Sequence, residues 1–328
     1  MTAPLNHADA PADDQATRLR ELVARLDRAR DARHEPPARP RAIRHAVSAP
    51  TRARTARVLA IASGKGGVGK SNLAVNLCAA LARRRLRVIL LDGDFGLANA
   101  DLLCGVRVGA HLGNVRDGDR SIESILIDAP GGFRLAPGAS GFTSLLSAPA
   151  AEHRRIVDRL AAIESACDAV VIDCGAGMGD GVLAFLAAAD LSILVATPEP
   201  TAIADTYALI KRFMRTTTGG GVALAPPRLV VNQCEDELEA ARVHTRIDSV
   251  ARRFLGVAIE RVGWIPTDGA VPAAVRARRP FVVGAPRSDA SRAVDRLALR
   301  LAPRLAPGVT PARDGFWRRL FRMRRSRE

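Results

Sequence analysis

Residues 64–71 of the chain read GKGGVGKS, and this stretch decides how the rest of the sequence is interpreted. It matches the pattern G-x-x-x-x-G-K-[ST] and lies between an apolar run at 58–62 (VLAIA) and a helix-like stretch at 70–84. Glycines let backbone N–H groups wrap a chain of phosphates, Lys70 can reach the β- and γ-phosphates, and Ser71 can bind Mg²⁺. The positive end of the following helix favours the same anion. The stretch therefore predicts a site for a nucleoside triphosphate.

Beyond this loop, short apolar runs alternate with helix-like stretches. Continuous apolar runs are typical of parallel strands whose two faces are both covered by helices. The pattern predicts an α/β fold, with a doubly wound, mostly parallel sheet and helices on both faces, over residues 58–303. The expected strands are at 58–62, 87–91, 169–173, 191–196, 228–232 and about 258–265, and the expected helices are at 70–84, 151–165, 201–215, 240–255 and 290–302.

The loop contains a second lysine, which an ordinary phosphate loop does not need. The chain has 49 basic residues but only three lysines, Lys65, Lys70 and Lys211, and two of them lie in this loop. With Lys65, the loop resembles the deviant Walker A motif, K-G-G-x-G-K-[ST], of the MinD/ParA/NifH (SIMIBI) ATPase family. In that family the early lysine reaches the phosphates of the nucleotide in the partner subunit. The resemblance implies an ATP-dependent homodimer in which Lys65 and Lys70 both serve catalysis; Lys211 has no predicted role.

Two further segments supply carboxylates to the same site. The segment that starts LLDGD carries Asp92 and Asp94, and AVVIDCGAGMGD carries Asp173 at the end of an apolar run. The resemblance implies that Asp94 positions the attacking water and that residues 175–177 form a switch that follows the γ-phosphate. Hydrolysis needs a carboxylate beside the attacking water, and Mg²⁺ prefers oxygen ligands. We expect Ser71, Asp92 and Asp173 to serve the metal.

The family binds its base with an asparagine after a late strand and with a loop around an Ile-Pro pair. VVNQC supplies Asn232, and GWIPTD supplies residues 265–268 with Pro266. An asparagine side chain can both donate and accept hydrogen bonds, which suits the adenine edge. The residues expected to hold ATP are Gly64, Lys65, Gly66, Gly67, Val68, Gly69, Lys70, Ser71, Asn72, Asn232 and Pro266.

Three segments narrow the resemblance within the family. Residues 94–106 (DFGLANADLLCGV) and 197–213 (TPEPTAIADTYALIKRF) look most like the FlhG/FleN (YlxH) subfamily, which controls flagellar number and placement. Within the N-terminal extension, residues 1–33, the run DQATRLR at 14–20 fits the D-Q-A-x-x-L-R motif of that subfamily. The motif implies that residues 13–26 dock on the GTPase FlhF and stimulate its hydrolysis, whereas a plain capped helix is the alternative. Other implied partners are flagellar basal-body proteins or a flagellar transcriptional activator.

Two Pro-rich linkers, 34–57 and 304–314, flank the central domain, and the chain ends with residues 315–328, GFWRRLFRMRRSRE. As a helix, this tail is apolar on one side and basic on the other, which is typical of a helix that lies on a membrane surface. It is too short to span a bilayer. We expect 315–325 to bind anionic membrane, with docking onto its own domain as the alternative. The apolar side would carry Phe316, Trp317, Leu320, Phe321 and Met323.

The charge is concentrated at the two ends of the chain. The formal net charge is +15, of which residues 1–57 carry +5, residues 304–328 carry +6 and the body only +4. No specific nucleic-acid binding is therefore expected. The five cysteines form no C-x-x-C pair and are expected to be small buried residues of a reducing compartment. The polar N-terminus lacks the apolar core of a signal peptide, so we expect a cytoplasmic protein at the inner face of the cell membrane.

Together these observations predict a Mg²⁺-dependent ATPase that dimerises with ATP, associates with the membrane and regulates flagellar assembly. The alternative is a positioning ATPase of the ParA type, for chromosomes or plasmids, or of the MinD type, for the division site. The DQATRLR extension argues against the MinD type, and the lack of paired cysteines argues against an iron–sulfur carrier. An adaptor that binds nucleotide without hydrolysing it also remains open.

Overall fold

The computed structural model describes residues 56–94, 99–138, 150–218, 224–306 and 315–325. The N-terminal extension (1–33) and most of the two linkers lie outside these ranges, so the expected partner helix at 13–26 does too.

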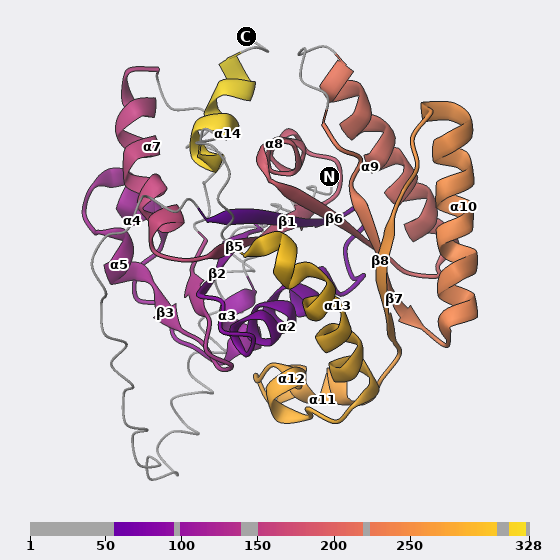
Figure 1. The fold of residues 1–328 in the computed structure, drawn as a ribbon. Coiled ribbons are helices and arrows are strands. Elements are labelled where there is room, and N and C mark those ends of the chain that lie inside the picture. The colour runs from indigo at the N-terminus through magenta and orange to yellow at the C-terminus, as the bar shows by residue number, and fades with distance from the viewer. Residues whose placement is uncertain (1–55, 95–98, 139–149, 219–223, 307–314, 326–328) are drawn as a thin grey trace, which may run out of the picture. The chain divides into compact units, whose positions relative to one another are not determined.

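One eight-stranded sheet forms the centre of the described part of the chain (Figure 1). Its order is β3-β4-β2-β5-β1-β6-β7-β8, and every pairing is parallel except that of β3 with β4. The central strand β1 lies between β5 and β6. The phosphate loop directly follows the carboxyl end of β1. The strands are β1 (Arg57–Ser63), β2 (Val88–Gly93), β3 (Ile127–Asp128), β4 (Arg134–Ala136), β5 (Ala169–Ala176), β6 (Leu191–Ala196), β7 (Arg228–Cys234) and β8 (Arg261–Pro266).

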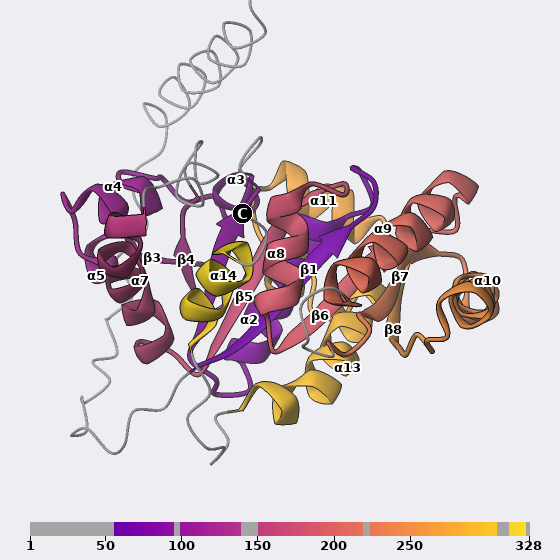
Figure 2. The same ribbon diagram turned by 90° about the horizontal axis from the view of Figure 1, so that it is seen from above.

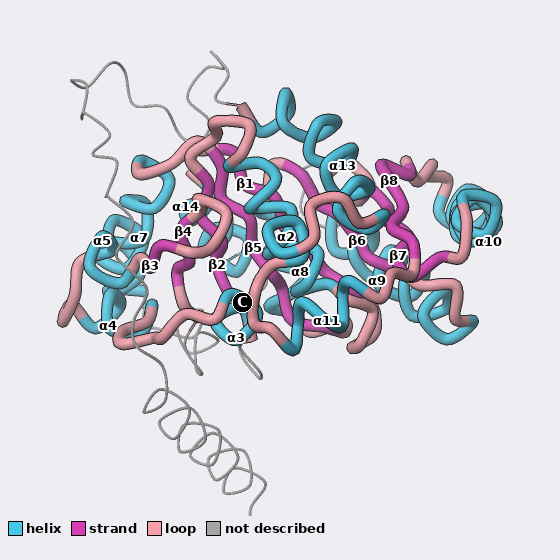
Figure 3. Tube along the Cα trace, turned by 90° about the horizontal axis from the view of Figure 1, so that it is seen from below, coloured by secondary structure: helices cyan, strands magenta, loops and turns pink. Residues whose placement is uncertain are grey.

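Helices cover both faces of the sheet (Figures 1 and 3). On one face lie α2 (Lys70–Ala82), α12 (Phe281–Gly284) and α13 (Asp289–Leu305). On the other lie α7 (Ala150–Ser165), α8 (Asp180–Ala188), α9 (Pro200–Thr218), α10 (Glu237–Leu255) and α14 (Phe316–Arg325). The shorter helices are α3 (Ala100–Cys104), α4 (Leu112–Asp117), α5 (Ile122–Ile125) and α11 (Ala270–Arg276).

The two helical layers produce two apolar cores, one on each face of the sheet. Strand β1 shows why: Val58 and Ala60 face one core, whereas Leu59 and Ile61 face the other. Successive apolar residues of the strand thus face opposite cores, which confirms the predicted doubly wound α/β fold. All five cysteines are buried and reduced, as expected, and burial raises the pKa of the Cys104 and Cys167 thiols to about 12.

Several short elements are absent from the sequence-based prediction. Strands β3 and β4 are two and three residues long, and α3, α4 and α5 have four to six residues. Elements this short contain too few residues to show a hydrophobic period. Helix α8 was missed for another reason: its sequence, DGVLAFLAA, is apolar nearly all round because it is packed between the sheet and α14.

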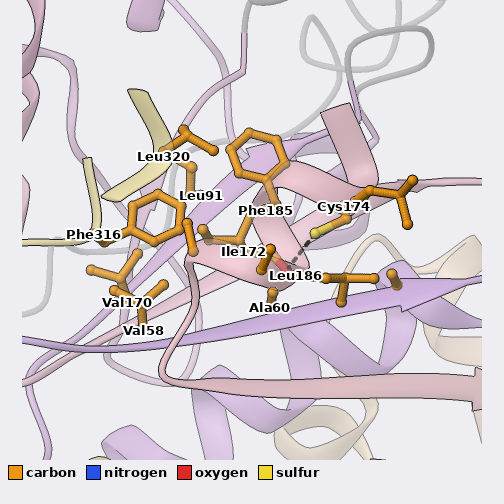
Figure 4. Packing of buried hydrophobic residues seen from close by; sticks show 14 of the residues in the cluster. Val58, Ala60, Leu91, Val170, Ile172, Cys174, Phe185, Leu186, Phe316 and Leu320 are labelled. Atoms are coloured by element: carbon orange, nitrogen blue, oxygen red, sulfur yellow. Dashed lines mark hydrogen bonds between the residues drawn. The ribbon is translucent and has the colours of Figure 1, made fainter. Parts of the chain in front are cut away.

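The C-terminal helix adopts the alternative given for it in the sequence analysis. We expected the apolar side of 315–325 to face a membrane, but α14 packs on α7 and α8, as Figure 2 shows. Phe316, Trp317 and Leu320 are each only 1% exposed. Phe316 stacks on Phe185 of α8 with ring centroids 6.1 Å apart, and Leu320 lies beside them (Figure 4). In this structure the alternative of docking onto its own domain is therefore the one observed.

A buried carboxylate fixes the start of α14. Glu164, at the end of α7, accepts hydrogen bonds from the backbone N–H groups of Phe316 at 3.1 Å and Trp317 at 3.3 Å. These are donors that the first turn of a helix cannot satisfy itself. Arg319 donates to the carbonyl of Ala188 and pairs with Asp190 at 3.1 Å. No helix in the described ranges has the length and apolar character to cross a bilayer.

Candidate nucleotide site

The phosphate loop connects β1 to α2 at the carboxyl edge of the sheet, where ligands of open α/β folds bind. Two of its glycines are required by close packing against other elements. Gly69 has φ of 84°, and a Cβ at this position would collide with the side chain of Asn232. A Cβ at Gly64 would collide with the backbone of Asp205 in α9. The loop is therefore seated against two neighbouring elements, which fixes its position at the end of β1.

A buried ion pair links the loop to β5, which pairs with β1 in the sheet. Lys70 Nζ donates to Asp173 Oδ1 at 2.6 Å, and the two side chains are 6% and 2% exposed. Burial alone would lower the pKa of Lys70, but the charge of Asp173 and their hydrogen bond raise it above its ordinary value. Lys70 is thus held as a cation, and the carboxylate that it contacts is the one expected to serve the metal.

Two more carboxylates border this pair. Asp92 lies opposite Asp173 in the register of β2 and β5, and Asp94 Oδ2 is 4.0 Å from Lys70 Nζ. Asp92 accepts backbone hydrogen bonds from Asp94 at 3.2 Å and from Ala100, the first residue of α3, at 3.1 Å. Burial, together with the charge of Asp173, raises the pKa of Asp92 to about 7. Three carboxylates therefore surround a single lysine, which leaves the site short of positive charge.

The donor set fits Mg²⁺ bound together with a nucleotide. Lys70 Nζ lies 3.4 Å from Ser71 Oγ and 2.6 Å from Asp173 Oδ1, which places a hydroxyl and a carboxylate beside the same cation. Within the described ranges, no three His, Cys, Asp or Glu side chains form a metal-binding group. Mg²⁺ in phosphate-loop sites is usually held by one or two protein oxygens, the phosphates and water, and needs no larger cage. Ser71, Asp173 and Asp92 supply hard oxygen donors of this kind.

The early lysine of the loop points toward a different element. Lys65 Nζ donates to Glu199 Oε2 at 2.7 Å and to Thr201 Oγ1 at 3.0 Å. Glu199 directly precedes α9, and Thr201 lies in its first turn. The sequence-based prediction missed both residues, although TPEPT follows the end of β6, the strand beside β1. A carboxylate at that edge of the sheet is the signal that could have identified Glu199.

Of the two residues expected to bind the base, Asn232 contacts the loop, whereas Pro266 lies on the edge strand β8. Asn232 follows the buried part of β7, and its amide donates to the carbonyl of Val68 at 2.8 Å. Pro266 ends β8 on the neighbouring strand. Ile265 is buried in the core, and Asp268 accepts backbone hydrogen bonds from Ala270 at 2.8 Å and Ala290 at 2.9 Å, at the starts of α11 and α13.

The remaining predicted residues lie near the site. Asn72 is in the first turn of α2. The switch segment reaches the loop through the backbone, because Gly177 donates to the carbonyl of Ser63 at 2.9 Å. Lys211, whose role was not predicted, lies half-buried on α9, about 16 Å along the helix axis from its first residue.

Comparison with known proteins relates this geometry to one group. Residues 59–281 match the model of the CobQ/CobB/MinD/ParA nucleotide-binding domain. Among curated proteins, the antiactivator FleN of Pseudomonas aeruginosa is 38% identical over 242 residues, which are 74% of this chain and 85% of FleN. The flagellum site-determining protein YlxH of Helicobacter pylori is 32% identical over 244 residues, which cover 74% of this chain and 80% of YlxH.

Solved structures share the fold. The chain of the MinC:MinD cell division complex of Aquifex aeolicus superposes with a TM-score of 0.61 at 24% identity, over 79% of this chain and all of that one. MinD of Pyrococcus horikoshii, solved with Mg-ADP, gives a TM-score of 0.58 at 24% identity, over 74% of this chain and 94% of that one. At this identity, the two structures support the architecture alone.

Proposed function

The chain belongs to the CobQ/CobB/MinD/ParA family of nucleotide-binding proteins, and from this premise we propose that it is an ATP-hydrolysing switch that controls flagellar number and placement. The observation that carries the proposal is the gathering of Lys65, Lys70, Asp94 and Asp173 around one phosphate loop. The similarity to FleN and YlxH, both named for flagellar regulation, supports the output. It also confirms the predicted resemblance to the FlhG/FleN subfamily.

Binding of ATP would rearrange the buried ion pair. The phosphates would replace Asp173 as the anionic partner of Lys70. The N–H groups of the loop and of the start of α2 would donate further hydrogen bonds to them. Mg²⁺, held by Ser71 and Asp173 with Asp92 beside them, would neutralise phosphate charge. Asp94 would orient the attacking water, because its carboxylate, which is 25% exposed, lies 4.0 Å from Lys70 Nζ.

Dimerisation would complete the site. Lys65 lies on the exposed side of the loop, with its side chain 40% accessible, whereas Lys70 is buried below it. A lysine in this position can serve a neighbouring subunit more readily than its own nucleotide. We therefore propose a homodimer in ATP, with each Lys65 contributing to the phosphates bound by the partner.

Membrane association would require α14 to leave its groove. In the docked state its apolar side is used against α7 and α8, so a membrane would have to replace that contact. Burying a large apolar side chain contributes about 1.5–3 kcal/mol in either setting. Undocking would also expose the apolar side chains of α7 and α8 and break the contacts of Glu164 and Arg319, so nucleotide binding or dimerisation would have to favour the undocked state. The arginines of 318–325 would then face anionic headgroups.

The test of the proposed function is a deletion in the native bacterium, complemented with the wild type or with Asp94→Ala. Flagella are counted and located in each strain by electron microscopy. We expect the deletion to change number or position, the wild type to restore both, and Asp94→Ala to fail, because it binds ATP without completing the cycle. The phosphate released by purified protein should fall to background in Asp94→Ala. Unchanged flagella in the deletion strain would contradict the proposal.

A further inference from the structure

The backbone directly after Asn232, one of the residues expected to bind the base, is irregular. Gln233 lies near the end of β7 and has φ of 59°, in the left-handed region that residues with a Cβ rarely adopt. From Val231 to Cys234, β7 advances three residues while its partner β8 advances two, so β7 carries an extra residue there. This is a β-bulge, a feature that often lies next to functional sites and turns a side chain in a new direction.

The bulge brings Gln233 to the phosphate loop. A Cβ added to Gly69 would lie 3.9 Å from Gln233 Nε2 and would collide with Asn232 Nδ2. Gly69 directly precedes Lys70, the first residue of α2. Consecutive side chains of a regular strand point to opposite faces of the sheet. The amides of Asn232 and Gln233 instead lie beside the same loop residue, which the irregular backbone makes possible.

The two amides differ in the groups that they can offer to a ligand. Asn232 donates through Nδ2 to the carbonyl of Val68 at 2.8 Å, so its amide helps to hold the loop. Gln233 is exposed, and its side chain has no hydrogen-bond partner among the described residues. A carboxamide has two N–H donors and one carbonyl acceptor. Gln233 can therefore offer all of these groups to a molecule in the site.

The order of the strands indicates which part of a nucleotide would meet Gln233. Asp173 lies in β5 and Asp94 follows β2, and both strands are on one side of β1. Gln233 lies in β7, on the other side of β1 and beyond β6. A nucleotide whose terminal phosphate faces Asp94 therefore has its nucleoside on the side of Gln233.

We propose that Gln233 is a nucleotide-binding residue that donates a hydrogen bond from Nε2 to the nucleoside of the bound nucleotide. The inference rests on the proposed function, because it needs ATP or ADP in the phosphate loop. Strained backbone conformations of this kind persist where the surrounding structure and function require them. One hydrogen bond between neutral groups changes a dissociation constant by about 2- to 10-fold, and this is the expected contribution of Gln233.

The first test uses Gln233→Gly to separate binding from folding. Glycine adopts a positive φ without the steric strain of a Cβ, so this variant should be at least as stable to urea as the wild type without nucleotide. Its dissociation constant for ADP with Mg²⁺, measured by isothermal titration calorimetry, should rise by about 2- to 10-fold. A less stable variant would show that the side chain serves its own fold, and unchanged ADP binding would equally overturn the proposal.

Two further variants control for the backbone and for the amide. Arg85 has φ of 65° in the turn between α2 and β2, at the edge of the sheet away from the loop, so Arg85→Gly makes the same backbone change there. That variant should bind ADP like the wild type. Gln233→Met keeps the strained backbone and nearly the same side-chain length but has no donor, so it should lose as much affinity as Gln233→Gly. Wild-type affinity in Gln233→Met would exclude the hydrogen bond.

The second test observes the amide of Gln233 directly. The chain contains only two glutamines, Gln15 and Gln233, so glutamine labelled with ¹⁵N in its side chain gives two amide signals in an NMR spectrum. Gln233→Met identifies one of them by removing it. ADP and the non-hydrolysable ATP analogue AMPPNP, each with Mg²⁺, should shift the Gln233 signal, because both carry the nucleoside. Pyrophosphate with Mg²⁺ should shift it less or leave it in place. No shift with ADP, or an equal shift with pyrophosphate, would overturn the contact with the nucleoside.

The outcomes separate this inference from the proposed function. If the wild type binds ADP and hydrolyses ATP while the Gln233 variants bind as tightly, the ATPase stands and the inference fails. If the variants bind ADP more weakly but the wild type releases no phosphate from ATP, the inference stands and the ATP-hydrolysing switch fails. If the wild type binds neither ADP nor AMPPNP, both fail.

Discussion

Lys70 and Asp173 show how much of the site a sequence can specify. The motif predicts that Lys70 reaches phosphates and that Asp173 ends a buried strand, because both depend on local patterns. Their direct contact at 2.6 Å depends on β1 and β5 being neighbours, which the fold class makes plausible but no local pattern states. The Lys65–Glu199 contact was not predicted, because it needs the exact approach of α9 to the loop.

At the residue scale, the buried pair predicts a stability effect in the absence of nucleotide. Lys70→Ala leaves the carboxylate of Asp173 buried without its cation, and we expect a loss of about 3 kcal/mol in the free energy of unfolding. Adding Asp173→Asn removes the unpaired charge and should recover at least about 1 kcal/mol. Urea denaturation of the wild type and both variants measures this. A double variant less stable than Lys70→Ala would show that the pair is not coupled as described.

At the scale of elements, α14 illustrates a limit of amphipathic patterns. The sequence shows one apolar and one basic side, and both a membrane and a protein groove can accept such a helix. The deciding features lie elsewhere in the chain: the apolar surface of α8 and the carboxylate of Glu164, which caps the helix from 152 residues away. The long strands were predictable because they are continuous apolar runs, and the long helices because helix-like stretches separate those runs.

Asp268 provides a prediction for helix capping. Its two oxygens accept N–H groups at the starts of α11 and α13, and these hydrogen bonds hold its pKa below the ordinary value of 3.8. Because the pKa of Asp268 is lower in the folded state than in the unfolded state, its stabilising effect is present at neutral pH. This effect is lost as the pH falls below 3.8 and through the pKa of the folded state. Asp268→Asn should cost about 1–2 kcal/mol at pH 7, and the difference should narrow between about pH 5 and 3.

Urea denaturation across this pH range measures the effect, with Asp119→Asn, at an exposed position, as the control. A difference for Asp268→Asn that is constant down to pH 3 would show that the carboxylate charge does not matter.

At the scale of the whole molecule, the charge distribution predicts that the protein binds an anionic membrane rather than duplex DNA. The body carries +4, whereas residues 304–328 alone carry +6. With AMPPNP and Mg²⁺, we expect co-sedimentation with vesicles that contain anionic lipid, weakening as salt rises, and little retention on duplex DNA. Removal of 315–328 should abolish vesicle binding while leaving AMPPNP binding intact. Equal vesicle binding with and without nucleotide would contradict a switch.

The docked C-terminal helix also has a consequence for the order of synthesis. The surface of α7 and α8 that α14 covers is complete once residue 188 has been made, but the residues that cover it, Phe316 to Phe321, are translated more than 120 residues later. Domains generally begin to fold from the N-terminus while the ribosome is still working. The nascent protein therefore holds an uncovered apolar surface until α14 has been made and has left the ribosome, and this interval is when chaperones or aggregation would compete for that surface.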